Sequence, residues 1–260
     1  MQLQRRTENG SPYYFVYEGE TLRGKASRFV DAIAGVLEPA EQASTLAAPL
    51  VPCEPSKIIC IGLNYRQHAE EMGKAIPEEP LVFSKPPSSL LADQGEIVLP
   101  LESEEVHYEG ELAVVIGRRC RRVKAQDAAS VIFGYTLLND VTARDLQRKD
   151  VQYTRGKGFD TFAPVGPRIV TGLDPNALEI ELRVNGEVRQ SSPVSDMIFS
   201  VAQIIEHVSA VMTLEPGDII ATGTPSGVGA LKHGDVVEVE IAEIGVLRNT
   251  VRDERVAAKG

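Results

Sequence analysis

The chain has 260 residues, of which 43% are hydrophobic and 25% charged, and its formal net charge is −10. These values are typical of a soluble globular protein, and the acidic balance argues against nucleic acid or an anionic membrane as the main partner. No apolar run is long enough to span a membrane, and the first residues lack the hydrophobic stretch of a signal peptide. The three cysteines show no paired spacing that would predict disulfides. We therefore expect a cytoplasmic location.

The first fifty residues differ in character from the rest of the chain. Residues 12–24 predict a short hairpin, and residues 27–37 predict a brief helix. A stretch that contains Pro49, Pro52 and Pro55 follows, and such recurring proline favours extended, non-helical backbone. We therefore predict a small N-terminal domain over residues 1–52 and a main domain over residues 53–260.

The main domain is predicted to consist mostly of strands separated by frequent turns. Strands are expected at residues 57–62, 81–85, 96–100, 111–117, 131–139, 218–223 and 235–245. Residues 178–191 predict a hairpin, because Asn185 and Gly186 both tolerate positive φ. The clearest helix is expected over residues 195–212, with apolar residues at helical spacing and Ser195 as N-cap. Because strands mostly follow strands, the predicted fold class is α+β, mostly β, with strands curled around a core.

Three carboxylates form a candidate metal site. Glu109 and Glu111 lie two positions apart in a strand-like segment, so their side chains share one face about 6–7 Å apart. Asp140 ends a second apolar run and could converge on them. Clustered carboxylates repel one another unless a cation lies between them, and an all-oxygen set suits Mg²⁺, Mn²⁺ or Ca²⁺. The alternative is a solvated acidic edge, which spacing alone does not exclude.

A candidate general base lies in a short helix predicted over residues 64–73. His68 and Glu71 are three residues apart and therefore lie on one helical face. A carboxylate beside an imidazole raises its basicity and fixes its tautomer. The alternative is a surface helix with an incidental ion pair. Residues 65–80 are polar and interrupted by glycine and proline, so we expect this segment to be mobile without ligand and ordered with a 2-oxo acid such as oxalate.

Two further segments carry polar side chains that could reach a site. Lys157 is flanked by glycines, which leave its side chain free to extend into a cavity. The Gly-rich turn at residues 223–229 has neither the spacing of a phosphate loop nor that of a nucleophile elbow. Thr224 and the amides of this turn could still bind a carboxylate. The alternative for the turn is a tight connection between strands.

Taken in order, these segments resemble the fumarylacetoacetate hydrolase family. The resemblance runs from Lys57 to Arg252 and rests on the motifs GLNYRQHAEE, PLVFSKP, HYEGELAVVIG, GYTLLNDVTARDLQ, KGFDTFAPVGP, NGEVRQ and DIIATGTPSGVG. It implies a mixed β-sandwich roll of the C-terminal type found in this family, usually assembled as a homodimer. The first fifty residues are similar to the small N-terminal extension of some members.

The resemblance also implies metal-binding, catalytic or substrate-binding roles for nine side chains and a structural role for two more. The divalent-metal ligands, for Mg²⁺ or Mn²⁺ with Ca²⁺ as an alternative, would be Glu109, Glu111 and Asp140. The catalytic residues would be His68, Glu71 and Lys157. The substrate-binding residues would be Lys85, Gln147 and Thr224. Arg144 and Asp145 are similar to structural residues behind the metal.

Such a site would bind a small 2-oxo acid through its carboxylate and keto oxygens. Because His68 and Glu71 are both present, we expect cleavage of a C–C bond through a metal-stabilised enolate, by acylpyruvate hydrolysis or oxaloacetate-type decarboxylation. The alternative is a 2-hydroxyhepta-2,4-diene-1,7-dioate isomerase or a 5-carboxymethyl-2-oxo-hex-3-ene-1,7-dioate decarboxylase of homoprotocatechuate catabolism. A non-enzymatic Ca²⁺-binding module would have no use for His68, Glu71 or Lys157.

Overall fold

The computed structural model of the protein describes residues 1–40 and 48–257, and within these ranges the chain forms three β-sheets. The largest is a ten-stranded mixed sheet in the order β3-β2-β1-β12-β10-β9-β15-β4-β5, in which β6 also pairs with β12. Its strands are β1 (Gln2–Glu8), β2 (Ser11–Glu18), β3 (Thr21–Ala26), β4 (Ile58–Gly62), β5 (Leu81–Lys85), β6 (Leu90–Ala92), β9 (Gly110–Ile116), β10 (Ile132–Asn139), β12 (Ala163–Val170) and β15 (Ile219–Ala221).

Two smaller sheets complete the β structure. A five-stranded sheet has the order β14-β13-β17-β18-β7, and a three-stranded sheet has the order β11-β8-β16. Their strands are β7 (Glu96–Leu99), β8 (Val106–Tyr108), β11 (Thr142–Ala143), β13 (Glu179–Val184), β14 (Glu187–Pro193), β16 (Gly229–Ala230), β17 (Val236–Ile241) and β18 (Gly245–Asp253). The predicted mostly β, α+β fold class is therefore confirmed.

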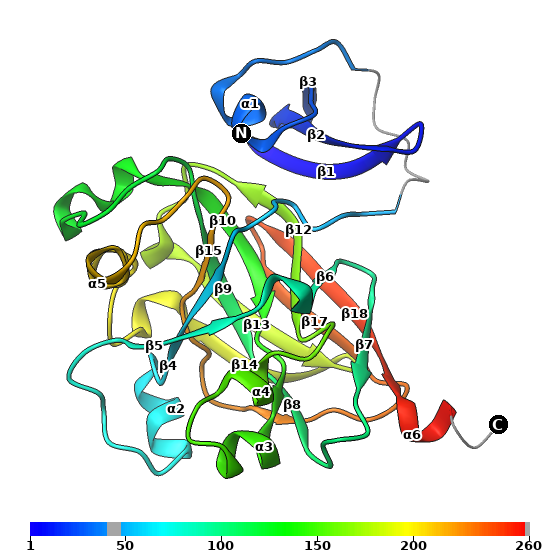
Figure 1. Cartoon of the computed structure of the whole chain (residues 1–260), viewed down its shortest axis with the longest axis vertical. Coiled ribbons are helices and arrows are strands. Elements are labelled where there is room, and N and C mark those ends of the chain that lie inside the picture. Colours follow the sequence, from blue (N-terminus) through cyan, green and yellow to red (C-terminus); the bar gives the residue numbers. More distant parts are fainter. Residues whose placement is uncertain (41–47, 258–260) are drawn as a thin grey trace.

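The helices are short and lie around the edges of the sheets. They are α1 (Phe29–Ala34), α2 (Arg66–Glu71), α3 (Arg144–Lys149), α4 (Thr154–Lys157), α5 (Val201–Val211) and α6 (Glu254–Ala257), with 3-10 turns η1 (Pro87–Ser89), η2 (Ala125–Ser130), η3 (Pro175–Ala177) and η4 (Val194–Asp196). Figure 1 shows α2, α3 and α4 gathered at the end of the molecule away from the N-terminal strands. Among the helices of residues 1–40 and 48–257, none combines the length and the apolar character that crossing a bilayer requires.

Two hydrophobic clusters cover the two faces of the large sheet. Leu112, Val114 and Ile116 of β9 pack in one cluster, whereas Ala113 and Val115 pack in the other. The first cluster includes side chains from β13 and β17, and the second includes side chains from α1. Because successive side chains of a strand point to opposite faces, a strand buried on both faces has a continuous apolar sequence. The central strand β9 is therefore packed against hydrophobic side chains on both faces of the sheet.

The N-terminal strands extend the large sheet. β1, β2 and β3 form an antiparallel meander packed against α1, at the top of Figure 1. The hairpin predicted at residues 12–24 corresponds to β2 and β3, and the helix predicted at residues 27–37 corresponds to α1. β1 is not predicted, because its sequence QLQRRTE is mostly polar and charged. It joins the sheet through Leu3, which lies opposite Ile169 of β12. The domain boundary after residue 52 stays a prediction.

The predicted strands of the main domain are present, and the missed ones have a physical explanation. The segments predicted as single strands up to residue 223 correspond to β4, β5, β7, β9, β10 and β15. The predicted hairpin is β13–β14, with φ of 53° at Asn185 and 80° at Gly186. β12 is not predicted because Pro164 and Pro167 cannot donate backbone hydrogen bonds to a ladder. The strand predicted at residues 235–245 ends earlier, at Ile241, and a short turn leads into β18, which pairs with it.

The helix predicted over residues 195–212 begins five residues later than its predicted cap. Ser200, not Ser195, is the N-cap of α5, and Gln203 completes a capping box with it. Ser195 lies in the preceding 3-10 turn η4. The N-cap prediction is therefore wrong, although the apolar stripe of the helix itself is buried as expected.

Tertiary pairing explains the late start of α5. The Ile198 amide donates to the Asn64 carbonyl at 2.7 Å, and the Phe199 amide donates to Asn64 Oδ1 at 2.8 Å. Tyr65 and Met197 form an isolated antiparallel bridge. Residues 197–199 are therefore extended against the segment before α2, and this pairing overrides the helical spacing of the sequence.

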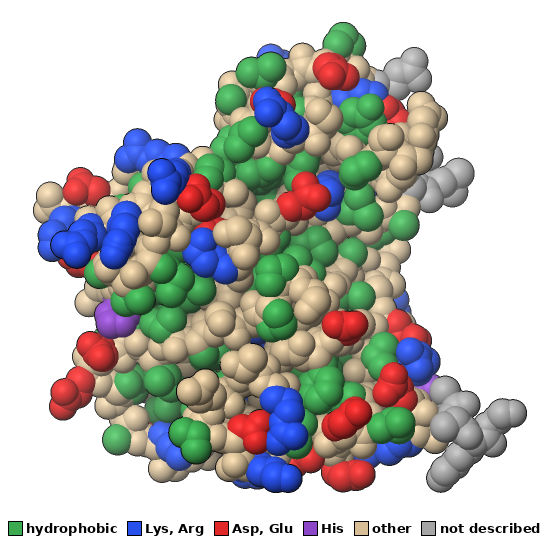
Figure 2. All heavy atoms as spheres, in the orientation of Figure 1, with side chains coloured by type: hydrophobic (Ala, Val, Ile, Leu, Met, Phe, Trp, Pro, Cys, Tyr) green, Lys and Arg blue, Asp and Glu red, His purple; other side chains and the backbone are tan. Residues whose placement is uncertain are grey.

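Charge is unevenly distributed over the surface of this acidic chain. Figure 2 shows basic side chains gathered at one corner, over the segment that joins β9 to β10. The exposed basic residues of that segment are Arg118, Arg119, Arg121, Arg122 and Lys124. Acidic side chains are spread more widely over the face that Figure 2 shows.

Candidate active site

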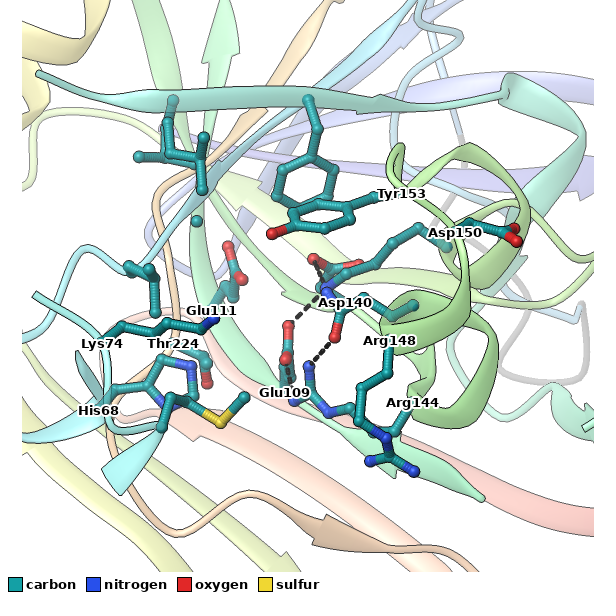
Figure 3. Close-up of a pocket in the computed structure, with 18 of the residues that line it drawn as sticks. His68, Lys74, Glu109, Glu111, Asp140, Arg144, Arg148, Asp150, Tyr153 and Thr224 are labelled. Carbon is teal, nitrogen blue, oxygen red and sulfur yellow. Dashed lines mark hydrogen bonds and ion pairs between the residues drawn. The ribbon is translucent and has the colours of Figure 1, made fainter. Parts of the chain in front are cut away.

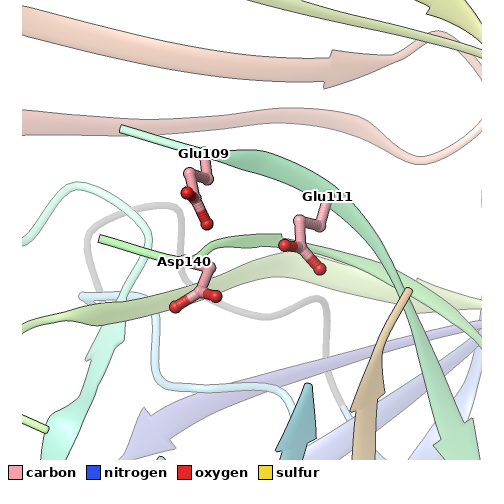
Figure 4. Close-up of side chains that lie close together, drawn as sticks. All are labelled: Glu109, Glu111 and Asp140. Atoms are coloured by element: carbon pink, nitrogen blue, oxygen red, sulfur yellow. The ribbon is translucent and has the colours of Figure 1, made fainter. Parts of the chain in front are cut away.

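Three buried carboxylates, here called the acidic triad, converge where β8, β9 and β10 meet. Glu109 lies between β8 and β9, Glu111 lies in β9, and Asp140 follows β10 directly. Asn139 is paired with Gly110 across the ladder, and the Asp140 amide donates to the Glu109 carbonyl at 2.8 Å. This register brings one oxygen from each carboxylate within 4.8 Å of the others, and Figure 4 shows the three side chains pointing toward a common space.

Three buried cations surround two members of the triad. Lys157 Nζ donates to Glu109 Oε2 at 2.7 Å and to Asp140 Oδ2 at 2.6 Å. Lys85 Nζ donates to the other Asp140 oxygen at 2.6 Å, and Arg144 pairs with the other Glu109 oxygen. Burial alone would raise the pKa of Glu109, but Arg144 and Lys157 hold that pKa well below its usual value.

Glu111 is the member of the triad whose negative charge is least compensated. Its Oε2 accepts a hydrogen bond from the Gly223 amide at 2.7 Å, and no Lys or Arg within the described ranges forms an ion pair with it. Burial and the nearby charges of Asp140 and Glu109 raise the pKa of Glu111 well above its usual value. A divalent cation would relieve this repulsion, and three carboxylates are hard oxygen ligands of the kind that Mg²⁺ and Mn²⁺ prefer. The residues present therefore fit such an ion.

The local backbone positions Glu111. Gly223 has φ of +100°, and a Cβ at this position would lie 2.7 Å from the Asn64 Cβ. Only glycine can therefore bring the amide at position 223 to the Glu111 carboxylate without displacing the segment before α2. The predicted Gly-rich turn thus contributes a hydrogen-bond donor to the triad.

His68 and Glu71 of α2 form a hydrogen-bonded pair beside the triad. His68 Nδ1 lies 3.1 Å from Glu71 Oε2, and His68 is 5% exposed. The other oxygen of Glu71 accepts a hydrogen bond from the Gly227 amide at 3.0 Å. If Nδ1 donates to Glu71, then Nε2 is the unprotonated nitrogen of the ring. The structure therefore provides a supported imidazole of the kind that acts as a general base.

A cavity of about 370 Å³ connects these groups. Its lining includes the triad, His68, Lys157, Gln147 and Thr224, and Figure 3 shows the labelled side chains around it. Burial lowers the pKa of Lys157, but Asp140 and Glu109 more than offset this effect, so the ammonium stays charged. The volume is at the small end of the range for ligand pockets, which suits a short-chain metabolite.

The three predicted substrate-binding residues occupy different environments. Gln147 lines the cavity and accepts a hydrogen bond from Arg144 at 2.8 Å. Thr224 also lines it, and its hydroxyl donates to the Gly110 carbonyl at 2.9 Å. Lys85 is 1% exposed and lies behind Asp140, where it also donates to the Val141 carbonyl at 3.0 Å, outside the cavity lining. Contact of these residues with a substrate stays a prediction.

Sequence reasoning did not assign roles to two residues that position the site. Gln190 is 1% exposed, donates to Thr224 Oγ1 and the Pro225 carbonyl at 2.8 Å each, and accepts from the Gly110 amide at 2.9 Å. Asn64 donates to the Thr222 carbonyl at 2.7 Å and so joins α2 to the Gly-rich turn. Gln190 is distinguished in the structure as a buried amide side chain in β14, a strand whose other positions are mostly exposed.

The chain is similar to several known proteins along most of its length. Residues 57–252 match the fumarylacetoacetate (FAA) hydrolase C-terminal family. The oxaloacetate tautomerase YisK of Bacillus subtilis is 49% identical over 220 residues, which cover 79% of this chain and 72% of that protein. A mitochondrial oxaloacetate tautomerase of Bos taurus is 44% identical over 249 residues, which cover 91% of this chain and 78% of that protein.

A solved structure extends the likeness to the whole fold. The crystal structure of a 5-carboxymethyl-2-hydroxymuconate delta-isomerase from Mycobacterium smegmatis is 42% identical in sequence and has a TM-score of 0.87. The likeness covers 97% of this chain and 99% of that chain. The N-terminal strands are therefore included in the shared architecture.

Proposed function

Because the chain belongs to the fumarylacetoacetate hydrolase family, we propose that it is a divalent-metal-dependent enzyme that enolises a small 2-oxo acid. Its principal reaction would be keto–enol tautomerisation. The observation that carries the proposal is that His68, held by Glu71, lines the same cavity as the acidic triad. A bound Mg²⁺ or Mn²⁺ would polarise the substrate's keto and carboxylate oxygens as a Lewis acid. The names of the Bacillus subtilis and Bos taurus relatives, both tautomerases of a 2-oxo dicarboxylate, support this choice of reaction.

His68 is the group placed to move the proton. With Nδ1 held by Glu71, Nε2 can remove a proton from the carbon next to the keto group. The positive charge that forms on the ring is balanced by the Glu71 carboxylate 3.1 Å away. Transfer of the same proton to the former keto oxygen gives the enol, and the reverse steps give the keto form. No carbon–carbon bond breaks, and no second base is required.

Lys157 is suited to stabilise the charge that develops on the substrate oxygen. Lys157 is 2% exposed, and its ammonium contacts Glu109 and Asp140 at the cavity. A fixed positive charge in a buried site stabilises an oxyanion more strongly than it would in water. Lys85 and Arg144 then keep Asp140 and Glu109 in position from behind the cavity.

Cleavage of a C–C bond is the second candidate. Acylpyruvate hydrolysis and oxaloacetate-type decarboxylation pass through the same kind of enolate, and a cavity of about 370 Å³ leaves room for a short acid together with water. In hydrolysis His68 would activate that water instead of a carbon acid. The similar Mycobacterium smegmatis protein is named a delta-isomerase, and an isomerisation of that kind needs only repeated proton transfer by the same pair.

One experiment separates these reactions. Metal-stripped protein is supplied with Mg²⁺ or Mn²⁺ and assayed for oxaloacetate tautomerisation, oxaloacetate decarboxylation and acetylpyruvate hydrolysis, and the three kcat/KM values are ranked. We expect tautomerisation to be fastest, to need the cation, and to be lost in a His68→Asn variant. A higher kcat/KM for hydrolysis or decarboxylation would favour the second candidate, and inactivity on all substrates with either cation would refute the proposal.

A further inference from the structure

The cavity contains one lysine that no carboxylate of the described chain neutralises. Four cations line it: Lys74, Arg144, Arg148 and Lys157. Arg144 and Lys157 are paired with members of the acidic triad, and Arg148 is paired with Glu105. Lys74 forms no ion pair with any residue in the ranges 1–40 and 48–257. Its ammonium is therefore available to a ligand.

The turn that ends α2 places Lys74 at the cavity. Gly73 has φ of +62°, and its amide donates to the Glu70 carbonyl at 3.0 Å. The Lys74 amide then donates to the Ala69 carbonyl at 2.9 Å, so the chain turns back over the end of the helix. Lys74 lines the cavity, and Figure 3 shows its side chain among the others that surround it. Lys74 thus belongs to the same short segment as the catalytic pair of α2.

The proposed function accounts for only one end of the substrate. A 2-oxo acid whose keto and first carboxylate groups face the triad must direct its remaining substituent into the rest of the cavity. The other lining residues include Met72, Leu81, Phe83 and Tyr153, which suit a methylene chain. An ammonium without a protein partner, beside this mostly apolar wall, suits a second carboxylate.

We propose that Lys74 determines substrate specificity by binding the distal carboxylate of a 2-oxo dicarboxylate, an inference that rests on the proposed function. A charge-assisted hydrogen bond between ammonium and carboxylate is stronger than a neutral one. A monocarboxylic acid of equal length makes no such bond and gains less from binding. Lys74 is exposed to solvent, which weakens the interaction relative to a buried pair.

The test compares two four-carbon 2-oxo acids, oxaloacetate and 2-oxobutanoate, which differ in the distal carboxylate. Exchange of their C3 hydrogens with D₂O in the presence of Mg²⁺, followed by proton NMR and corrected for the enzyme-free rate, measures enolisation of both. Lys74→Gln should lower kcat/KM for oxaloacetate about tenfold and leave 2-oxobutanoate nearly unchanged. Lys74→Arg should retain most of the oxaloacetate rate, because it keeps the charge.

Two controls make the result decisive. Lys149→Gln removes the charge of an exposed lysine on α3 that does not line the cavity, and it should match the parent. Oxalate has no distal substituent, so its calorimetric Kd with Mg²⁺ should be the same in the parent and in Lys74→Gln. Equal losses on both acids, an equal loss in Lys149→Gln, or weaker oxalate binding would overturn the role of Lys74. Failure of the parent to exchange either acid or to bind oxalate would overturn the proposed function and this inference with it.

Discussion

Replacing Glu111 with Gln tests the contribution of the acidic triad to cation binding. Glu111 is the triad member that is held by the Gly223 amide and not by an ion pair, and burial with the charges of Asp140 and Glu109 raises its pKa. Gln has nearly the same shape, and its carbonyl oxygen can accept the same hydrogen bond. We therefore expect the cation-free variant to fold and to be at least as stable as the parent at neutral pH, because it buries no repelling charge.

The expected magnitude follows from the linkage between binding and folding. A ligand that binds only the folded state and is present at about 100 times its Kd raises the free energy of unfolding by about 2.7 kcal/mol. For a chain of this size each kcal/mol corresponds to about 2–4 °C in Tm, so Mn²⁺ should raise the Tm of the parent by roughly 5–11 °C. The same Mn²⁺ concentration should raise the Tm of Glu111→Gln by much less, since one of three ligands is neutral.

The pH dependence of this effect has a definite sign. In the cation-free parent the folded pKa of Glu111 lies above its unfolded value, so the unfolded chain releases this proton at lower pH than the folded chain. The free energy of unfolding therefore falls as pH rises from the unfolded pKa toward the folded one. A cation needs the ionised carboxylate, so the gain in Tm with Mn²⁺ should grow over the same interval. Glu111→Gln should lack both trends.

The assay is differential scanning calorimetry with EDTA or Mn²⁺ over roughly pH 5–8, where the unfolded carboxyl is ionised. A matched control is Glu243→Gln, which removes an exposed carboxylate between β17 and β18 and should respond to Mn²⁺ like the parent. A Mn²⁺-induced rise in Tm that is as large in Glu111→Gln as in the parent would refute the reasoning. So would a parent whose Tm does not respond to Mn²⁺ or Mg²⁺.

Three further substitutions test other parts of the site and fold. His68→Asn should lower kcat for enolisation by about 10²–10⁴-fold with an unchanged calorimetric Kd for Mn²⁺, and a parallel loss of Mn²⁺ affinity would argue against a role as base. Lys157→Met removes an ammonium that contacts Glu109 and Asp140, so it should bind Mn²⁺ more tightly in the same titration. Its kcat should nevertheless be lower, because the charge that stabilises the substrate oxyanion is gone. Weaker Mn²⁺ binding would show that the lysine instead holds the carboxylates in place. Ser200→Ala should lower the free energy of unfolding in urea by about 1 kcal/mol without changing kcat, and an unchanged urea midpoint would contradict its role as the N-cap of α5.

Local strand spacing predicts that Glu109 and Glu111 share one face, whereas the assignment of Asp140 as a third ligand rests on the resemblance to the fumarylacetoacetate hydrolase family. Strand periodicity puts Glu109 and Glu111 on one face, and the antiparallel register of β9 and β10 brings Asp140 beside them. The His68–Glu71 pair follows from helical spacing, and His68 lines the cavity together with the triad. The Glu109–Glu111 and His68–Glu71 pairs have short sequence separations and are therefore predictable, whereas Asp140 reaches the triad through pairing between separate strands.

Features that depend on contacts between distant segments could not be predicted. The start of α5 at Ser200 is set by hydrogen bonds to Asn64, which lies 135 positions before Phe199 in the sequence and holds the residues ahead of the helix extended. The buried position of Lys85 behind Asp140 depends on a contact between the end of β5 and the residue after β10, which lie 55 positions apart in the sequence. Gln190 is identified as a positioning residue only when β14 is placed against the Gly-rich turn.

The two oxygens of the Glu71 carboxylate hold the His68 ring and also attach α2 to the Gly-rich turn. One oxygen contacts the His68 ring, and the other accepts a hydrogen bond from the Gly227 amide of the Gly-rich turn. If α2 moves away from the turn, the Gly227 bond breaks and the carboxylate is free to rotate away from the imidazole. The His68 ring then loses the partner that holds its tautomer and orientation. Carbanion character would therefore develop only when α2 is docked, which protects the substrate from indiscriminate protonation by solvent.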